Sequence, residues 1–286
     1  MANLKELRSR IISVSSTMQI TSAMKMVSAA KLSRAQDAIT AMRPYSQKLS
    51  ELLQSLSATL GDDQESKYSQ QREVRKVLIV AISSNRGLAG AFNSNIVKAV
   101  KDLAVTEYAG KDIEVMTIGK KANDILKKSF KIQKNNTEVY DNLHFDYVAA
   151  IGEELMEHFV SGRYDKIVLV YNQFKNAATQ VVMREQFLPV VPVEKKDTLI
   201  LDYIFEPSKE EIVKELVPKS LKMQLFKALR DSFASEHGAR MTAMHKATDN
   251  ATELRDSLKL SYNKARQASI TNEILEIVGG AEALNK

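Results

Sequence analysis

Residues 241–284 repeat small apolar side chains at alternating spacings of three and four, with charged residues between them. This pattern is typical of a helix that packs along another helix. Because most of the stripe is alanine, the two backbones can approach closely while each turn buries little apolar area. We therefore predict a long helix over residues 209–286. The stripe consists of Met244, Ala247, Ala251, Leu254, Leu258, Ser261, Ala265 and Ala268.

The first sixty residues carry a second helical stripe. Its first members follow a heptad, it slips through Ile20, Met24 and Val27, and it resumes over residues 42–56. Two such helices can pair parallel or antiparallel. In the simplest arrangement, the first helix leads into one middle domain and the second leads out of it. We expect an antiparallel coiled coil of residues 1–60 with the C-terminal helix. The heptad positions are Leu4, Leu7, Ile11, Val14 and Met18.

The middle of the chain changes its period. Three short apolar runs, rich in β-branched residues, are typical of strands buried on both faces, and two helical patterns alternate with them as in βαβ units. The runs are 77–82, 113–118 and 167–171, and the helical patterns are 89–104 and 147–160. A further strand-like stretch lies at 179–184, before Pro189 and Pro192. We predict a small Rossmann-like α/β domain with a mainly parallel sheet over residues 75–205.

Composition excludes several classes of protein. The 286 residues are 44% apolar and 27% charged, which is ordinary for a folded chain. The absence of cysteine excludes a disulfide framework, a thiol nucleophile and cysteine metal sites. No apolar run approaches the roughly 18 residues that a membrane span needs, and residues 1–10 are too charged for a signal peptide. We expect a protein that is neither secreted by that route nor integral to a membrane.

The net charge of +6 lies on the two helical segments. Eight basic and three acidic residues give residues 1–57 a charge of +5, and 13 basic against 11 acidic residues give residues 209–286 a charge of +2. Neither segment has a block of consecutive basic residues or interleaved stacking aromatics, so the charge does not favour nucleic acid. A basic shaft that faces acidic protein surfaces fits as well.

The loop at residues 83–93 follows the first strand, where a Rossmann domain keeps its phosphate loop. It has Gly87 and Gly90 but neither the three spaced glycines of a dinucleotide fingerprint nor the lysine of a Walker loop. The structural interpretation is that Gly87 permits a tight turn and Gly90 lets the next helix pack close to the sheet. Arg86 is still a candidate for holding an anion or a partner carboxylate. The loop is therefore a weak nucleotide candidate.

Other catalytic patterns are sparse. The histidines are His144, His158, His237 and His245, and their spacing matches no metal motif, so we expect them on the surface or facing a partner. No Gly-x-Ser-x-Gly elbow occurs, and the adjacent acidic pairs resemble solvated faces. An independent enzyme is disfavoured, and we expect no cofactor and no metal.

Five segments, in order along the chain, resemble the gamma subunit family of F-type ATP synthases. They are ITSAMKMVSAAK at 20–31, SNRGLAGAFN at 84–93, YIFEP at 203–207, ARMTAM at 239–244 and ARQASITNEILEIVGGAEAL at 265–284. The terminal block is the most specific, and the resemblance covers the whole chain. Asn85 departs from the family, many members of which carry aspartate there.

The resemblance implies a non-catalytic central rotor stalk that couples ion-driven rotation of the c-ring to ATP synthesis or hydrolysis. The helices would stand inside a ring of three alpha and three beta subunits, and the α/β domain would sit with the epsilon subunit on the c-ring. Catalysis would belong to the beta subunits. Without a transit segment, we expect a bacterial member that is peripheral to the cytoplasmic face of its membrane.

The motif match also implies contact residues. Candidates for contact with the beta subunits are Met24, Lys25, Arg266, Gln267 and Thr271. Without the resemblance, packing within the helix pair would be the preferred role of Met24.

Three residues resemble the family segment near the c-ring and epsilon subunit: Tyr203, Phe205 and Glu206. Two other functions remain open at this stage. A nucleotide-binding α/β protein would need a complete phosphate loop. A coiled-coil scaffold would leave the intervening α/β domain unexplained.

Overall fold

A computed structural model describes residues 4–59, 67–141, 143–190 and 209–284. The chain divides into two compact units. The helical unit comprises Met1–Ser28 and Met241–Lys286, and the α/β unit comprises Ala29–Arg240. The two long helices, α1 (Leu4–Thr59) and α5 (Lys209–Leu284), each contribute residues to both units.

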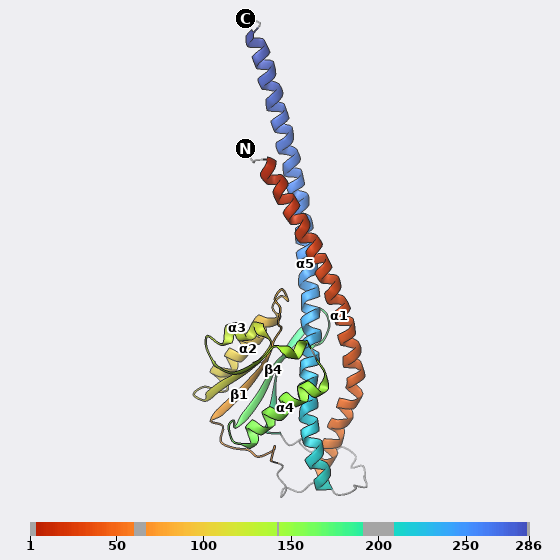
Figure 1. The fold of residues 1–286 in the computed structure, drawn as a ribbon, viewed down its shortest axis with the longest axis vertical. Coiled ribbons are helices and arrows are strands. Elements are labelled where there is room, and N and C mark those ends of the chain that lie inside the picture. Colours follow the sequence, from red (N-terminus) through yellow and green to blue (C-terminus); the bar gives the residue numbers. More distant parts are fainter. Residues whose placement is uncertain (1–3, 60–66, 142, 191–208, 285–286) are drawn as a thin grey trace. The chain divides into compact units, whose positions relative to one another are not determined.

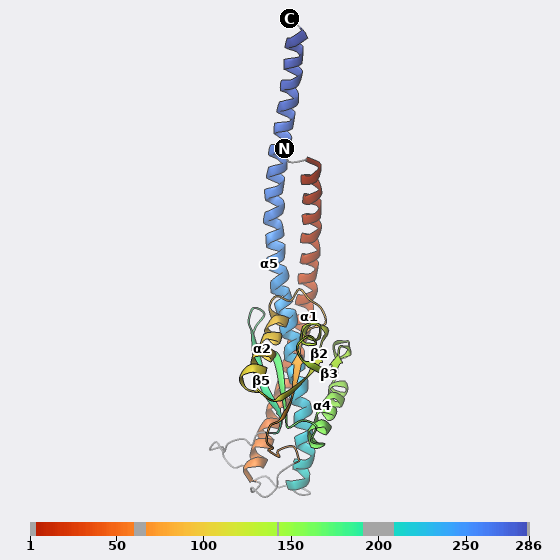
Figure 2. The ribbon, with the colours of Figure 1, turned by 90° about the vertical axis from the view of Figure 1, so that its left-hand side faces the viewer.

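In the helical unit, α1 and α5 pack antiparallel, as the sequence predicts. Thr21 Oγ1 lies 2.8 Å from Thr248 Oγ1, and Met18 Sδ lies 3.4 Å from Arg255 Nη1. Residue numbers therefore fall along one helix as they rise along the other. Figures 1 and 2 show this pairing, and they show α5 continuing past the first turn of α1.

The buried stripe of α1 is an unbroken heptad within this unit. The predicted slip is wrong, because Ile20 and Val27 are 60% and 57% exposed. The stripe instead continues through polar residues, and Ser28 is buried. Its buried and half-buried members are Leu4, Leu7, Ile11, Val14, Met18, Thr21, Lys25 and Ser28.

The matching stripe of α5 also differs in part from the prediction. Leu254 is 52% exposed, whereas the side chain of Arg255 is only 23% exposed. The long apolar stem of arginine can fill a packing position while its charge reaches water. A prediction that chose residues by their polarity was therefore wrong by one residue at every second position of the stripe. The observed stripe is Met244, Thr248, Ala251, Arg255, Leu258, Tyr262, Ala265 and Ser269. Residues 270–281 are all exposed.

The α/β unit contains a five-stranded sheet in the order β3-β2-β1-β4-β5. The strands are β1 (Lys76–Ile82), β2 (Asp112–Ile118), β3 (Lys131–Asn136), β4 (Lys166–Phe174) and β5 (Gln180–Leu188). Strands β1 to β4 run parallel to one another, and β5 is antiparallel to β4. The predicted mainly parallel sheet is therefore confirmed, with β3 as an additional edge strand.

Helices cover both faces of the sheet (Figure 1). Apolar residues of α2 (Phe92–Thr106) and α3 (Lys120–Leu126) pack on one face. The other face packs against α4 (Phe145–Val160) and the first part of α5, including Leu221, Leu225 and Leu229. The C-terminal helix thus completes the core of the α/β unit. A short 3-10 helix, η1 (Glu138–Tyr140), follows β3.

None of the described helices has the length and apolar character that crossing a membrane requires.

Candidate functional site

The loop at 83–91 joins the carboxyl end of β1 to α2. The chain runs from β1 to β2 on one side, and β4 lies on the other side of β1, so this is the point where the strand order reverses. Open α/β sheets bind their ligands in the crevice at such a point. The loop is therefore the first place to examine for a functional site.

Side chains within and beside the loop fix its path. Ser84 N donates to Asn93 Oδ1 at 3.0 Å, and Ser84 Oγ donates to the carbonyl oxygen of Arg86 at 2.6 Å. Asn85 Nδ2 donates to the carbonyl of Thr137 at 2.8 Å, while Asn85 Oδ1 accepts from the backbone N–H of Lys120 at 3.1 Å. An ionised aspartate could accept but not donate here, so asparagine at position 85 serves both bonds.

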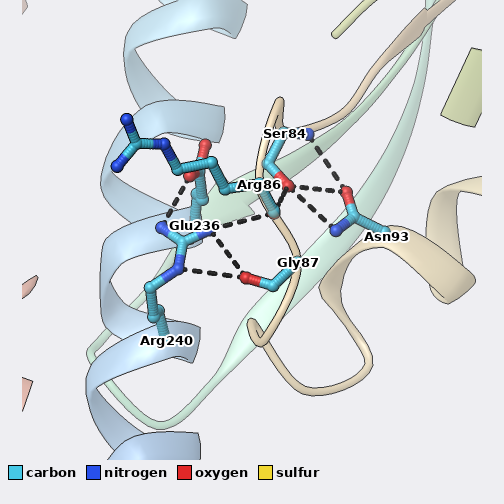
Figure 3. A network of polar contacts seen from close by, with 6 residues as sticks. All are labelled: Ser84, Arg86, Gly87, Asn93, Glu236 and Arg240. Carbon is cyan, nitrogen blue, oxygen red and sulfur yellow. Dashed lines mark hydrogen bonds and ion pairs between the residues drawn. The ribbon is translucent and has the colours of Figure 1, made fainter. Parts of the chain in front are cut away.

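Arg240 of α5 anchors the loop from the other side (Figure 3). Its Nη2 donates to the carbonyl oxygens of Arg86 at 3.1 Å and Gly87 at 3.3 Å, and its Nε donates to Gly87 at 3.3 Å. Its Nη1 donates to Glu236 Oε1 at 2.6 Å. Arg240 and Glu236 are 6% and 7% exposed, so the ion pair is buried and hydrogen-bonded to the loop. We call Arg240, Glu236 and the two loop carbonyls the arginine anchor.

The polarity of this site is opposite to that of a phosphate site. A phosphate loop turns backbone N–H groups towards an anion, whereas this loop turns two carbonyl oxygens towards a guanidinium cation. The loop lies at the usual ligand-binding position of such a sheet, but its carbonyl oxygens bind the chain's own arginine. The arrangement does not favour nucleotide binding.

Two adjacent titratable residues of α5, Glu236 and His237, are buried at the anchor. Burial raises the pKa of the Glu236 carboxyl, and the nearby cations Arg240, Lys31 and Arg86 offset part of that rise. Burial, together with the nearby charges of Arg240 and Lys31, lowers the pKa of His237 to about 4. The cations that act on the Glu236 carboxylate therefore outnumber it.

The expectation that all four histidines are exposed or face a partner is wrong for His237. It is 5% exposed, and its ring meets Phe233 edge to face with centroids 4.5 Å apart. Neither ring nitrogen has a hydrogen-bond partner within the described part of the chain. Protonation would place a third cation beside Arg240 and Lys31, so the neutral form is favoured.

The loop also contains an unusual backbone conformation. Leu88 has φ 60° and is 64% exposed, and it is the one non-glycine residue with positive φ in the described ranges. Gly90 has φ 56°. The left-handed residues of the turn are thus Leu88 and Gly90 rather than the predicted Gly87. Leucine in this region carries a steric cost that persists only where the surroundings enforce it.

The structure places the predicted contact residues at different levels of the helical unit. Met24 and Lys25 are half-buried on α1, with Lys25 Nζ 3.4 Å from His245 Nδ1 of α5. Arg266, Gln267 and Thr271 are exposed on α5. The Thr271 hydroxyl donates to the carbonyl oxygen of Gln267 at 2.9 Å, which is a bond within the helix.

Tyr203, Phe205 and Glu206 lie outside the described residues. Arg240 and Glu236 were missed as site residues by the sequence reasoning, although Arg240 lies in the ARMTAM segment. Their spacing of four on a helix was an available signal for an ion pair. In the described ranges, no group of three or more His, Asp or Glu residues is placed to hold a metal ion.

Together these features define a class of protein. It has an antiparallel pair of long terminal helices and an α/β unit whose core includes one of those helices. At the point where the strand order reverses, an arginine from the same helix hydrogen-bonds the loop that follows β1.

Comparison with known proteins agrees with this architecture. The family model described as ATP synthase matches residues 3–284. The ATP synthase gamma chain of Christiangramia forsetii is 75% identical over 285 residues and covers the whole of both chains, and that of Geobacter metallireducens is 46% identical over 99% of each. The chain belongs to the ATP synthase gamma chain family, whose members are non-catalytic central stalk subunits of F-type ATP synthases.

Solved structures show the same fold. A chain from the central stalk and c-ring structure of the Tetrahymena thermophila mitochondrial ATP synthase aligns with a TM-score of 0.60 at 26% identity, over 80% of this chain and 99% of that one. A chain of the Euglena gracilis mitochondrial ATP synthase rotor aligns with a TM-score of 0.69 at 23% identity, over 93% of this chain and 98% of that one.

Proposed function

We propose that the chain is the rotor shaft that couples ion-driven rotation of a c-ring to ATP synthesis or hydrolysis. Its helical unit would stand inside a ring of three alpha and three beta subunits, and its α/β unit would bind the epsilon subunit and the c-ring. The complex would lie on the cytoplasmic face of a bacterial membrane. An asymmetric shaft would contact the three beta subunits differently, and so would favour a different conformation in each.

The distribution of apolar residues in the helical unit carries this proposal. The packing stripe of α1 uses Thr21, Lys25 and Ser28, while Ile20 and Val27 are more than half exposed. A helix pair that worked alone would bury its apolar residues in the seam. Exposed apolar residues also follow the last part of α5: Ile270, Ile274, Leu275, Ile277 and Val278. This pattern supports an enclosing protein partner around the helical unit.

We place the beta-subunit contacts at two levels of this unit. Met24 and Lys25 would act from α1, beside the exposed Val27, and Arg266, Gln267 and Thr271 would act from α5. A hydrogen bond to a charged group contributes about 1.5–3 kcal/mol, enough to bias a conformation yet weak enough to break at each step. Contact of Tyr203, Phe205 and Glu206 with the c-ring and epsilon subunit rests on the sequence resemblance.

ATPase activity of purified alpha and beta subunits from the same bacterium, measured with and without this chain, tests the proposal. We expect the chain to be inert alone, to join the ring and to raise its turnover. Hydrolysis by the chain alone, or failure to join the ring, would contradict the rotor function.

Two variants test whether α5 contacts a beta subunit at Arg266. We expect Arg266→Ala to lower the stimulated turnover by up to about tenfold, the equivalent of one charged hydrogen bond. Lys264→Ala removes another exposed cation two residues away and should leave turnover unchanged. Equal effects of the two variants would show that only the overall charge of α5 matters.

A further inference from the structure

The amino-terminal edge of the parallel sheet carries many basic residues. Strands β1 to β4 are parallel and paired side by side, so their first residues lie at the same edge of the sheet. Three of these four strands begin with a lysine: Lys76, Lys131 and Lys166. The segments that lead into the strands at this edge are 67–76, 107–114, 127–131 and 161–166. We call these four segments the basic edge.

Charge is unevenly distributed over the middle of the chain. Residues 58–208 contain 20 basic and 21 acidic residues, so this part of the sequence is nearly neutral. The basic edge holds ten of those basic residues but only five of the acidic ones. The edge therefore has a local excess of positive charge that the net charge of the domain does not reveal.

The carboxylates of the basic edge are largely bound within it. Asp165 Oδ2 accepts from the backbone N–H groups of Arg75 and Lys76 at 3.0 and 2.9 Å. Glu114 is only 8% exposed and pairs with Lys131. The negative charge at this edge is thus partly covered, whereas the lysines reach the surface.

Three lysines of the basic edge lie free at the surface. Lys111, Lys127 and Lys128 are exposed, and no hydrogen bond or ion pair engages their side chains within the described ranges. By contrast, Arg72 donates from Nη1 to the carbonyl oxygen of Phe159 at 3.1 Å. A lysine ammonium is a strongly hydrated point charge on a flexible stem. Free lysines of this kind suit a diffuse negative surface better than a fixed pocket.

The basic edge offers little apolar or aromatic surface. None of the large apolar side chains that the described residues expose lies in its four segments, and Tyr68, Tyr108 and Tyr164 are buried. A protein interface needs an apolar core, and single-stranded nucleic acid needs exposed rings on which bases stack. An anionic lipid surface needs neither, and each lysine near it adds about fivefold to the affinity. These observations favour lipid headgroups over a protein or a nucleic acid.

We infer that the basic edge binds the anionic phospholipid headgroups of a membrane surface. The inference rests on the proposed function, in which the c-ring holds the α/β unit beside a bacterial membrane. The attraction acts over about 8 Å at physiological ionic strength and requires no fixed geometry. Because headgroups are mobile, the contact persists while the α/β unit turns.

Vesicle binding tests the inference. The full chain is mixed with vesicles of phosphatidylcholine alone, or of phosphatidylcholine and phosphatidylglycerol in equal parts, and the bound fraction is measured by flotation. We expect binding to the anionic vesicles only, and its loss in about 1 M salt, where the Debye length is about 3 Å. The triple variant Lys111→Gln/Lys127→Gln/Lys128→Gln should lower the affinity by about tenfold or more.

A second triple variant controls for net charge, because the helical segments of the chain are basic as well. Lys98→Gln/Lys120→Gln/Lys175→Gln removes three exposed lysines that lie outside the basic edge, and it should change vesicle affinity much less. All six substituted lysines are exposed. Both triple variants should therefore keep the Tm and the ATPase stimulation of the wild type.

A probe on the chain locates the contact. The chain has no cysteine, so Ser129→Cys places one fluorophore on the basic edge, and Ala178→Cys places one in the turn between β4 and β5. Both positions are exposed. With a quencher attached to the lipid headgroups of the anionic vesicles, we expect quenching at position 129 and little at position 178.

The outcomes are distinct. Equal losses of affinity in the two triple variants, or equal quenching at the two positions, would overturn the inference, because net charge alone would then explain the binding. A wild-type chain that does not bind anionic vesicles at low salt would also overturn it and would leave an acidic protein surface as the partner. A wild-type chain that binds vesicles but fails to stimulate the ring would refute the proposed function instead.

Discussion

Gly119 follows β2 at the point where that strand passes the end of β1. Its φ is +103°, and an added Cβ would stand 2.2 Å from the carbonyl oxygen of Ser83. The close approach of Gly119 to Ser83 matters because Ser83 also holds the start of α3: its hydroxyl accepts a hydrogen bond from the backbone N–H of Ala122 at 3.0 Å. A backbone carbonyl cannot move aside as a flexible side chain can.

We expect Gly119→Ala to destabilise the protein by about 4 kcal/mol or more, since steric overlap adds to an unfavourable φ. Gly110→Ala is the matched control. Its φ is +76° but nothing lies within 4 Å of the added Cβ, so the loss should be about 1–2 kcal/mol. Urea unfolding of both variants measures the difference. Equal losses would mean that the close approach to Ser83 contributes nothing.

The lowered pKa of His237 predicts how the stability of the protein depends on pH. Because its pKa is lowered to about 4 in the folded chain, the unfolded chain binds a proton more readily below its ordinary pKa of about 6.5. The stability that the neutral imidazole contributes is complete above that pH and is lost as pH falls towards 4. We expect His237→Gln to flatten this acid dependence in urea unfolding at several pH values.

His245→Gln, which changes an exposed histidine of α5, is the control variant for that experiment. A His237→Gln variant as acid-sensitive as the wild type would show that other groups govern the effect.

Single residues also show where sequence reasoning failed. Apolarity placed Ile20 in the seam of the helix pair, but the strict heptad places Thr21 there and leaves Ile20 exposed. The spacing of three and four was the correct signal, and the hydrophobicity of individual residues misled. The same cause put Leu254 in place of Arg255. If a partner encloses the pair, both the seam and the outer face require apolar residues, and the sequence of one chain cannot separate the two.

At the scale of elements, the strands buried on both faces were predicted because they are continuous apolar runs. The predicted helix at 89–104 begins later, at Phe92, because residues 83–91 form the loop. Strand β3 and helix α3 were missed. The sequence of β3 is KIQKNN, with one large apolar residue, as suits an edge strand that carries lysines to limit pairing with other chains. The limits 1–60, 75–205 and 209–286 for the domains remain a prediction.

The two parts of α5 should differ in stability. Residues 209–240 supply core side chains to the α/β unit, and Leu225, Ala228 and Leu229 are fully buried. From residue 270 onward every residue with a described side chain is exposed. Local opening costs little where few apolar contacts are lost.

We therefore expect strong amide protection over residues 217–240 of the free chain and weak protection over 262–284, measured by hydrogen exchange with mass spectrometry. Uniform protection along α5 would contradict this gradient.

At the scale of the whole molecule, the terminal sequence block was the strongest signal. It led to the gamma chain family, which the match over residues 3–284 and the relatives at 46–75% identity establish. Physical patterns alone predicted the helix pair and the parallel sheet. They did not predict the arginine anchor, because it joins residues 86–87 to residue 240 and depends on how the loop and α5 meet in the fold.

Direct observation of rotation tests the central claim. The chain has no cysteine, so Lys98→Cys on the exposed side of α2 gives a single site for a probe on the α/β unit. With the alpha and beta subunits fixed to a surface, addition of ATP should turn the probe in one direction in discrete steps. ATP hydrolysis by the assembled ring with a stationary probe would show that the chain activates the ring without acting as its rotor.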